Sequence, residues 1–475
     1  MGIRDFLERA ASKSSKIASD LRDLIGDDKV SSSMSDLLVY CHDYSPINLH
    51  RLLRLDFDSF PLVVAWPEDS DDVAKILRYA RDNGVPVYPY GGGSGVLEAF
   101  KPLSSGIVVD LKRMNHIKLD EDNFLVDCGA GVNGMVLEKY LNTRDFTLGH
   151  IPQSLLESTV GGWVATKATG QFSTKYGGIE YLIAGLEVVT PSGEVIFCKP
   201  HPRSAVGPDL KGLFIGSEGM FGIVTRVVFR VWPYPEKRAK LSFLSDSFEE
   251  ALYSVRNILR KGIFPAVIRI YDKLETLRHF YWVDGVKGRV ITIIISEGNE
   301  KVVDAEASVI KSTFKGRELG EEPVDHWLKT RFIVKEASIY APLGFVFDTI
   351  EVAAVWSKVM KLYNEVTRSI KNVNGTLFAS AHASHFYLQG ACLYFTFGGL
   401  PPKDMSVYDY HRNVWKGAMD AVLRVGGTIS HHHGIGRVRA PWIRDELGDA
   451  GFLLLKRLKE IIDADNIMNP NNMGV

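Results

Sequence analysis

The stretch that decides the fold reads VPVYPYGGGSG and runs from Val85 to Gly95. Residues 85–90 predict a strand, and the glycines around Ser94 predict a turn directly after it. Adjacent glycines expose backbone N–H groups that can cradle a diphosphate, because no Cβ blocks the approach. The spacing is not the G-x-G-x-x-G of a dinucleotide-binding unit, so a nicotinamide cofactor is not favoured.

The chain on both sides of this turn has an α/β pattern. Residues 62–65 predict a strand, and turn chemistry at 67–72 precedes a helix with apolar positions at helical spacing. Two later segments are also rich in glycine and small side chains: GHIPQSLLESTVGGW from Gly149 to Trp163, and GSEGMFGIVT from Gly216 to Thr225. Each alone is compatible with ordinary turns, but the three together indicate a nucleotide site.

A fourth glycine-rich segment, GGTISHHHGIG, runs from Gly426 to Gly436 and holds three consecutive histidines. It lies far from either terminus, so the triplet is not a purification tag. Histidine has the unperturbed pKa nearest neutrality, which suits proton transfer. The alternative is a surface loop with solvated histidines, and the segment alone does not decide between the two.

Length and composition limit the class of protein that the sequence can encode. The 475 residues suggest two or three domains, and the net charge of −1 gives no electrostatic case for nucleic acid as a partner. Four widely spaced cysteines without a C-x-x-C pair suit a reducing compartment. The sequence shows no run of 18 apolar residues and no signal-peptide core. We therefore expect a cytoplasmic protein, with membrane association on the cytoplasmic side as the alternative.

Residues 3–25 carry apolar side chains at helical spacing, and their acidic and basic residues balance. A membrane-surface helix is normally basic on its polar face, so we expect a helix packed on the protein. The apolar positions are Ile3, Phe6, Leu7, Ala10, Ile17, Leu21, Leu24 and Ile25.

A break at residues 233–235, Pro-Tyr-Pro, separates the glycine-rich half from the rest of the chain. Beyond it the pattern predicts strands with helices between them, which favours an antiparallel α+β sheet. The last 40 residues return to helix at 452–462. The predicted strands are 241–244, 266–270, 289–296 and 391–397.

Together these segments resemble the vanillyl-alcohol-oxidase superfamily of FAD enzymes, which has a p-cresol-methylhydroxylase-type flavin domain. The resemblance covers nearly the whole chain after residue 40. It is greatest to the alkylglycerone-phosphate synthase branch, and the FAD-linked D-lactate, glycolate and 2-hydroxyglutarate dehydrogenases form the related branch. The resemblance is carried by Gly149–Trp163, Gly216–Gly219, Ile268–Arg269, Gly390–Phe395 and Ser430–Gly434.

The resemblance implies an α+β fold with three parts. A two-subdomain FAD-binding domain would carry an α+β cap domain with an antiparallel sheet, and C-terminal helices would return to the FAD domain. A homodimer is expected from the resemblance alone. The expected division is a helical extension at 1–40, the FAD-binding domain at 41–235, the cap domain at 236–440 and a C-terminal helical segment at 441–475.

The resemblance also implies which residues bind FAD. The first glycine turn would wrap the diphosphate, a second set would approach the flavin and ribityl chain, and a third would lie near the adenine. Covalent members attach FAD through a histidine in the glycine turn; none occurs at 91–96, so non-covalent FAD is expected. The residues are Tyr90, Gly91, Gly92, Gly93, Ser94, Gly95, Pro152, Ser158, Thr159, Gly161, Gly162, Thr166, Glu218, Gly219 and Ile223.

On the substrate side, Arg269 matches an active-site arginine of the family, and Tyr394 keeps the family's spacing of 38 residues before His432. A guanidinium suits a carboxylate or a phosphate. The alternatives are a surface charge at a strand end for Arg269 and a core aromatic for Tyr394. We expect His432 to be the general base, with His431 and His433 as turn residues or in exchanged roles.

The chain departs from the synthases at His382, because they have an arginine there. The dehydrogenases have an H-x6-H metal pair and a glutamate; here His382 matches the first ligand, Gln389 stands at the second, and His432 replaces the glutamate. A divalent metal on His382 and His432 would be short of ligands, and we expect none. On a regular strand His385 would face away from His382.

Two reaction classes stay open. We expect an FAD-dependent oxidation of a small 2-hydroxy acid or a hydroxyl-bearing phosphate ester, by hydride transfer to flavin N5. The partners would be an anionic small molecule and an electron acceptor (a quinone, a carrier protein or oxygen), with peripheral membrane contact as an option. The alternative is an ether-lipid synthase that exchanges an acyl group for an alkoxide without net redox. A flavin-binding protein without activity is the third reading.

Overall fold

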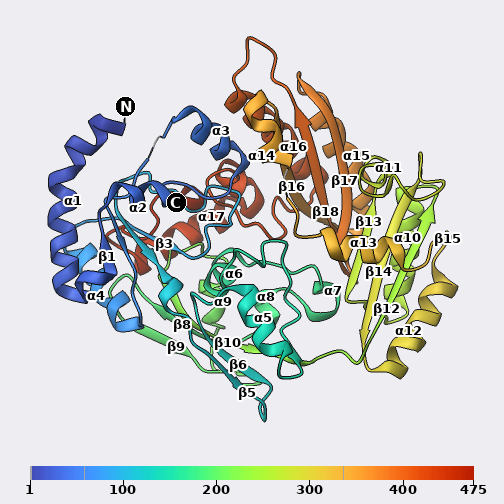
Figure 1. Ribbon diagram of the computed structural model, residues 1–475, viewed down its shortest axis with the longest axis horizontal. Coiled ribbons are helices and arrows are strands. Elements are labelled where there is room, and N and C mark those ends of the chain that lie inside the picture. The colour runs from blue at the N-terminus through green and yellow to red at the C-terminus, as the bar shows by residue number, and fades with distance from the viewer. Residues whose placement is uncertain (1–2, 58, 335) are drawn as a thin grey trace.

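The computed structural model describes residues 3–57, 59–334 and 336–475, without the side chains of residues 3–12 and 336. Within this range the chain is a mixed α+β molecule, as the sequence predicts. A large sheet lies beside a group of smaller sheets and helices (Figure 1). The smaller sheets belong to the first half of the chain, up to residue 233, and the large sheet belongs to the second half.

The first sheet positions the glycine turn. Its strand order is β1-β2-β4-β3, and β2, β3 and β4 run parallel, so the turn leaves the carboxyl end of β3. The helix α4 precedes β3 and begins where the Asp69 side chain accepts the Asp72 N–H. The elements are β1 (Val30–Ser31), β2 (Val63–Ala65), β3 (Val87–Tyr90), β4 (Ile107–Asp110), α2 (Met34–Val39), α3 (Pro46–Arg54) and α4 (Ser70–Asp82).

The helix α1 (Ile3–Ile25) packs on the protein next to α4, as expected. Ile17, Leu21 and Ile25 are buried, whereas Leu24 is exposed. The predicted apolar positions Ile3, Phe6, Leu7 and Ala10 have side chains outside the described part of the chain.

The second sheet is antiparallel, with the order β5-β6-β10-β8-β9. It includes a hairpin, because a Pro-Ser-Gly turn at residues 191–193 separates two apolar runs that pair as β8 and β9. A small antiparallel pair joins β7 (Phe146–Thr147) to β11 (Trp232–Pro233), the last strand before the large sheet. The other elements are β5 (Ile117–Asp120), β6 (Leu125–Gly129), β8 (Ile183–Val189), β9 (Val195–Cys198), β10 (Ile223–Arg230), α5 (Gly134–Asn142), α6 (Val160–Thr166), α7 (Ser173–Tyr176), α8 (Ile179–Leu182) and α9 (Lys211–Phe214).

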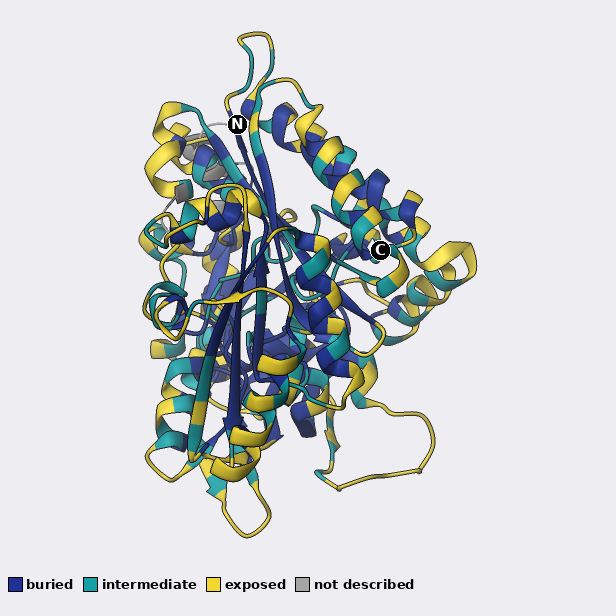
Figure 2. Cartoon of the chain, turned by 90° about the vertical axis from the view of Figure 1, so that its right-hand side faces the viewer, coloured by how far each residue is buried: buried dark blue, intermediate teal, exposed yellow. Residues whose placement is uncertain are grey.

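The large sheet has the order β15-β12-β14-β13-β17-β18-β16, and every pairing in it is antiparallel. Figure 2 shows its long strands buried and the outward faces of the surrounding helices exposed. The elements are β12 (Lys237–Ser245), β13 (Val267–Tyr271), β14 (Val290–Gly298), β15 (Arg317–Glu318), β16 (Val346–Val355), β17 (Thr376–Tyr387), β18 (Gly390–Gly399), α10 (Phe248–Arg260), α11 (Lys273–Phe280), α12 (Glu300–Thr313), α13 (Glu322–Thr330), α14 (Glu336–Tyr340), α15 (Trp356–Lys371) and α16 (Val407–Val425).

The short helix α7 joins the two halves. Tyr176 donates its hydroxyl to Glu297 on β14 at 2.7 Å, and the Phe386 N–H on β17 donates to Thr174 at 3.1 Å. Ser173 Oγ lies 2.7 Å from His385 Nδ1. These contacts fix the end of β17 against the first half of the chain.

The C-terminal part returns to the first half, as expected. The red helix α17 (Ile443–Ile462) lies among the blue elements in Figure 1. Met468 bridges to Val87 on β3, and Lys459 donates to the Met220 carbonyl at 3.2 Å. The domain boundaries given above stay a prediction.

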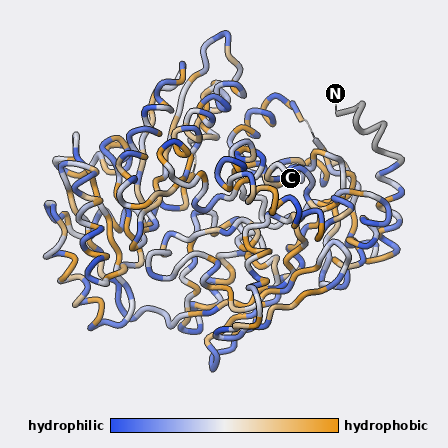
Figure 3. Tube along the Cα trace, turned by 180° about the vertical axis from the view of Figure 1, so that it is seen from behind, coloured by the Kyte–Doolittle hydropathy of each residue, from blue (hydrophilic) through white to orange (hydrophobic). Residues whose placement is uncertain are grey.

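Apolar and polar stretches alternate along the chain trace (Figure 3). Among the described residues, the helices are all too short or too polar to cross a bilayer.

Candidate functional site

Neighbouring strands of the large sheet bring three predicted residues together. His382 on β17 lies directly opposite Tyr394 on β18, and their rings stack 4.8 Å apart. Arg269 on β13 donates from Nη2 to His382 Nε2 at 2.6 Å. Burial and the Arg269 cation hold the pKa of His382 well below its usual range, so this imidazole is neutral near pH 7.

The triple-histidine turn, residues 431–433, lies next to this group. The His432 ring centroid is 6.1 Å from that of Tyr394 and 4.5 Å from that of His433. Burial lowers the pKa of all three imidazoles, to about 4 for His431. All three are therefore neutral near pH 7 and able to accept a proton.

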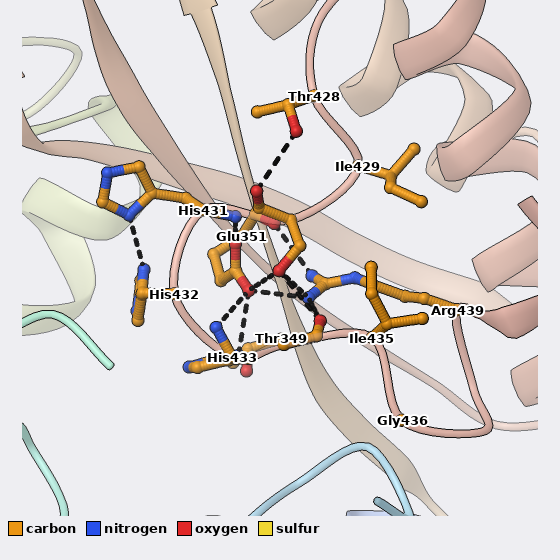
Figure 4. A network of polar contacts seen from close by, with 12 residues as sticks. Thr349, Glu351, Thr428, Ile429, His431, His432, His433, Ile435, Gly436 and Arg439 are labelled. Carbon is orange, nitrogen blue, oxygen red and sulfur yellow. Dashed lines mark hydrogen bonds and ion pairs between the residues drawn. The ribbon is translucent and has the colours of Figure 1, made fainter. Parts of the chain in front are cut away.

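Glu351 on β16 holds this turn in place (Figure 4). Its carboxylate accepts the N–H groups of His431 and His433 at 2.5 and 2.8 Å, and it pairs with Arg439 at 2.7 Å. Both charged side chains are fully buried. Burial alone would raise the pKa of Glu351, but Arg439 and then His433 lower it to about 2. Sequence reasoning missed Glu351 and Arg439, because nothing local marks a contact between such distant positions.

The structure corrects the expectation for His385. Regular alternation would turn it away from His382, but the register of β17 shifts between Ser384 and Phe386. His385 there takes a left-handed φ of 52°. Its ring lies 4.9 Å from that of His432, so it borders the same cluster as His382. The prediction of opposite faces was wrong, because a β-bulge changes the direction of the side chain.

One group of histidines has the spacing of possible metal ligands. His385, His431 and His432 each place a ring nitrogen within 4.8 Å of the others, and this group differs from the pair considered from the sequence. The Nδ1 atoms of all three already have partners: His431 Nδ1 lies 2.9 Å from His432 Nδ1, and His385 Nδ1 contacts Ser173 Oγ. We interpret the group as a hydrogen-bonded network and assign no metal to it.

A cavity of about 750 Å³ lies between the two halves of the chain, within the usual size range of ligand sites. The first half contributes Thr166 and Glu218 to its lining, and the second half contributes Tyr387, His431 and His432. The cavity therefore joins the predicted cofactor side to the predicted base. The residues Arg269, His382 and Tyr394 and the glycine turn 91–95 are not part of this lining.

A second arginine, Arg331, was not expected from the sequence. Its guanidinium lies 5.3 Å from the centroid of Trp327 on α13, and that of Arg269 lies 5.6 Å from the same ring. Arg331 Nε and Nη1 are buried and have no hydrogen-bond partner among the described residues. Burial, with the Arg238 cation, lowers its pKa to about 10, so it stays charged near pH 7. The segment around Arg331 carries no pattern that signals this.

The glycine turn has the features that a phosphate-bearing cofactor requires. A Cβ on Gly91 would collide with Thr159 Oγ1, and one on Gly92 would collide with the Glu157 carbonyl, so only glycine fits against this segment. Gly93 has a φ of 65°, which favours glycine. Thr159 Oγ1 is buried without a hydrogen-bond partner in the described structure. An unpaired hydroxyl beside a glycine turn fits a bound FAD.

The second predicted set lies on and before α6. The Trp163 N–H donates to Ser158 Oγ at 2.8 Å, and Thr166 Oγ1 donates to the Gly162 carbonyl at 3.0 Å. Gly161 packs on Ala130. The roles assigned to Tyr90, Ser94, Gly95, Pro152, Ser158, Thr159, Gly161, Gly162 and Thr166 stay predictions.

Glu218 links the two halves at the triple-histidine segment. Its carboxylate accepts the N–H groups of Ile435 and Gly436 at 2.6 and 2.9 Å and the Asn472 amide at 2.8 Å. Burial raises the pKa of this carboxyl group. Glu218 therefore positions the segment that follows the histidines. Its predicted place near the adenine stays a prediction, as do those of Gly219 and Ile223.

The family follows from two matches. The FAD binding domain model matches residues 61–199, and the C-terminal domain model of FAD linked oxidases matches residues 234–473. The chain belongs to the FAD-linked oxidases. It is therefore a flavoenzyme of an oxidoreductase family, and its cofactor is FAD.

Individual relatives belong to both branches. The chain is 29% identical to the alkyldihydroxyacetonephosphate synthase of Trypanosoma brucei brucei, over 96% of this chain and 80% of that protein. It is 25% identical to the mitochondrial D-lactate dehydrogenase [cytochrome] 1 of Saccharomyces cerevisiae, over 97% and 80% of the two chains.

The solved structures agree with the fold. An alkyldihydroxyacetonephosphate synthase has a TM-score of 0.80 at 25% identity, covering 96% of this chain and 84% of that one. A p-cresol methylhydroxylase shares the fold, with a TM-score of 0.76 at 18% identity over 97% and 96% of the two chains.

Proposed function

We propose that the protein oxidises a small 2-hydroxy acid or a hydroxyl-bearing phosphate ester with FAD. One observation carries this proposal: Arg269 and Arg331 lie over the same Trp327 ring. Neither guanidinium has a carboxylate within 4 Å among the residues that the structure describes, although Nε and Nη1 of Arg331 are buried. An anionic substrate would supply the missing partner through charge-assisted hydrogen bonds.

His432 is the proposed general base. It is neutral and lines the cavity, so it can take the hydroxyl proton of the substrate. Tyr394 donates its hydroxyl to Thr349 Oγ1 at 3.0 Å, which leaves its oxygen able to accept a hydrogen bond from the substrate. Burial raises the pKa of Tyr394 to about 12, so the phenol orients the substrate and does not act as a base.

FAD supplies the hydride acceptor when it is bound. The proposed binding residues are the glycine turn 91–95, the segment 158–166 and the segment 218–223. Their glycines permit a close approach, and the buried hydroxyl of Thr159 is available to the cofactor.

The second candidate is an ether-lipid synthase that acts on acyl-glycerone phosphate. The similarity to alkyldihydroxyacetonephosphate synthases over 96% of the chain favours it. A phosphate would suit the same two guanidiniums. The neutral His382 counts against it, because the synthase branch is expected to have a permanent positive charge at that position.

We also propose an electron acceptor, which is a quinone, a carrier protein or oxygen. A homodimer, peripheral membrane contact and a cytoplasmic location are further proposals.

A substrate panel tests the proposed function. Purified holoenzyme would be assayed with an artificial dye acceptor on D-lactate, glycolate, D-2-hydroxyglutarate and glycerol phosphates, with lactamide as the uncharged match to lactate. Turnover of one anion but not of the amide supports the proposal. No dye reduction by any of them, together with alkyl transfer from a fatty alcohol to acyl-glycerone phosphate, would replace it with the synthase.

A further inference from the structure

A chain of hydrogen bonds leads away from the proposed base. His432 Nδ1 lies 2.9 Å from His431 Nδ1, and His431 Nε2 lies 2.8 Å from the Tyr387 hydroxyl. The two histidines belong to the triple-histidine turn, whereas Tyr387 ends β17. His432 Nε2 has no hydrogen-bond partner among the residues that the structure describes, so it is the nitrogen left for a substrate.

The chemistry of imidazole fixes the proton positions in this chain. A neutral imidazole has one N–H and one lone pair, so a base at His432 Nε2 requires the proton on Nδ1. His432 Nδ1–H then donates to His431 Nδ1, which leaves the His431 proton on Nε2. His431 Nε2–H in turn donates to the Tyr387 oxygen. All three side chains are then neutral, and each hydrogen bond is donated in the direction from His432 to Tyr387.

The acidities of the three groups agree with this arrangement. Burial lowers the pKa of His431 to about 4, and it also holds the pKa of His432 well below its usual range. Burial also raises the pKa of Tyr387, so its hydroxyl keeps a proton to pass on. None of the three groups is expected to be ionised at rest near pH 7.

The outer end of the chain lies close to solvent. Tyr387 is directly followed by the β17–β18 turn, in which Leu388 is 62% exposed and Gln389 is also exposed. Tyr387 and Gln389 both line the cavity. A substrate and a cofactor that cover His432 would block its direct access to water, whereas Tyr387 lies beside an exposed turn.

We infer that His432, His431 and Tyr387 form a proton-exit path for the reaction under Proposed function, on which this inference rests. The substrate hydroxyl proton binds His432 Nε2, and the Nδ1 proton of His432 moves to His431 Nδ1. The Nε2 proton of His431 moves to the Tyr387 oxygen, and the original hydroxyl proton of Tyr387 leaves to water. One proton enters, one leaves and no charge remains on the path.

The starting state is restored after the product leaves. The path then holds the opposite tautomers, with the His432 proton on Nε2 facing the cavity. That proton passes to cavity water, and the transfers run in reverse from a water at Tyr387. The path therefore needs no group beyond these three residues and water.

The first test reads the tautomers and needs no turnover. Oxidised holoenzyme labelled with ¹⁵N in its histidines would be studied by NMR, with His431 and His432 assigned by single substitutions. We expect His432 to carry its proton on Nδ1, although Nε2–H is the ordinary form of free histidine. We also expect Tyr387→Phe to change the spectrum of His431 while His433 keeps its own. A His432 proton on Nε2 would overturn the inference.

The second test measures the path in action. Anaerobic flavin reduction by the best hydroxy acid would be followed in Tyr387→Phe, with Tyr253→Phe on the outer face of α10 as the matched control. We expect a slowing on the order of tenfold, below the loss from removing a general base, with partial recovery in imidazole buffer. The control should keep the wild-type rate.

The outcomes separate the two proposals. If the flavin of Tyr387→Phe is reduced at the wild-type rate, the exit path is overturned and the proposed function stands. If no hydroxy acid reduces the flavin of the wild-type protein, the proposed function is removed. The tautomer of His432 would then still decide whether the hydrogen bonds run from His432 to Tyr387.

Discussion

The guanidinium of Arg331 buries its Nε and Nη1 without an ionic partner in the described structure, and an unpaired cation of this kind costs stability until an anion binds. Arg331→Met keeps the length of the side chain and removes the charge. We expect the KM for an anionic substrate to rise by about 10- to 100-fold, as for the loss of charged hydrogen bonds. We expect the melting temperature to be unchanged or higher.

The control for Arg331 is Arg256→Met, an exposed arginine on α10. It should change neither quantity. A large fall in melting temperature for Arg331→Met with an unchanged KM would mean that this arginine has a structural role only.

Glu351 makes stability depend on pH. The folded protein lowers the pKa of this carboxyl group from 4.5 to about 2. The stabilisation is therefore complete above the unfolded pKa and is lost as the pH falls through the folded one. A shift of this size corresponds to about 3 kcal/mol. We expect the free energy of unfolding to fall between pH 5 and pH 2 (about the span of the two pKa values), measured by denaturant titration.

The variant Glu351→Gln tests the origin of this effect, because it leaves Arg439 buried without its partner. We expect a loss of about 3–5 kcal/mol at pH 7 and a flatter dependence on acid pH. Glu300→Gln, on the exposed start of α12, is the matched control. An unchanged acid dependence in Glu351→Gln would assign the effect to another carboxylate.

At the scale of single residues, the sequence predicts part of the site. Motif and spacing predict Arg269, Tyr394 and His432. The structure places them in one cluster, in which His382 contacts both Arg269 and Tyr394 and the Tyr394 ring lies near His432. Glu351 and Arg331 do not follow, because a carboxylate in a strand and an arginine after a helix are ordinary in sequence. Their roles come from burial and from partners far away in the chain.

At the scale of elements, the bulge in β17 shapes the cluster. His385 has a φ of 52°, a conformation that asparagine tolerates and β-branched residues do not. His385→Val and His385→Asn both remove the imidazole. We expect the valine variant to be less stable than the asparagine variant by about 1–2 kcal/mol, measured by thermal or chemical unfolding. Equal stabilities would mean that the strand loses its bulge without cost.

Elements with a clear local sequence pattern are predicted, and elements without one are not. The hairpin of β8 and β9 is predicted correctly because a Pro-Ser-Gly turn separates two apolar runs. β17 is not predicted, because Thr376–Tyr387 is rich in alanine, serine and histidine and lacks apolar alternation. Its place in the middle of the sheet comes from pairing with β13 and β18, which no local pattern encodes.

At the scale of the whole molecule, the site depends on the contact between the two halves. Gly434 follows the triple histidines with a φ of 85°, and a Cβ there would collide with the Glu218 carboxylate. We expect Gly434→Ala to lower both the melting temperature and the FAD content of purified protein. Gly212→Ala, where a Cβ meets nothing within 4 Å, is the control. Full FAD content in Gly434→Ala would show that this contact is dispensable for the cofactor site.

The α+β architecture that the sequence predicts is confirmed, with the smaller sheets before residue 234 and the large sheet after it. The sequence does not predict how the parts meet. That arrangement rests on α7 and on the C-terminal return to β3, whose partners are side chains and carbonyls of distant segments.

In the proposed reaction, a neutral His432 starts the oxidation of an anionic hydroxyl compound by FAD. The most direct measurement is anaerobic bleaching of the flavin absorbance by D-lactate, glycolate, D-2-hydroxyglutarate and glycerol phosphates, in the wild-type protein and in His432→Ala. We expect one of these compounds to bleach the flavin, with the matching carbonyl product formed in equal amount, and we expect the bleaching to be lost in the variant. Intact yellow colour with every compound, or equal bleaching in His432→Ala, would contradict it.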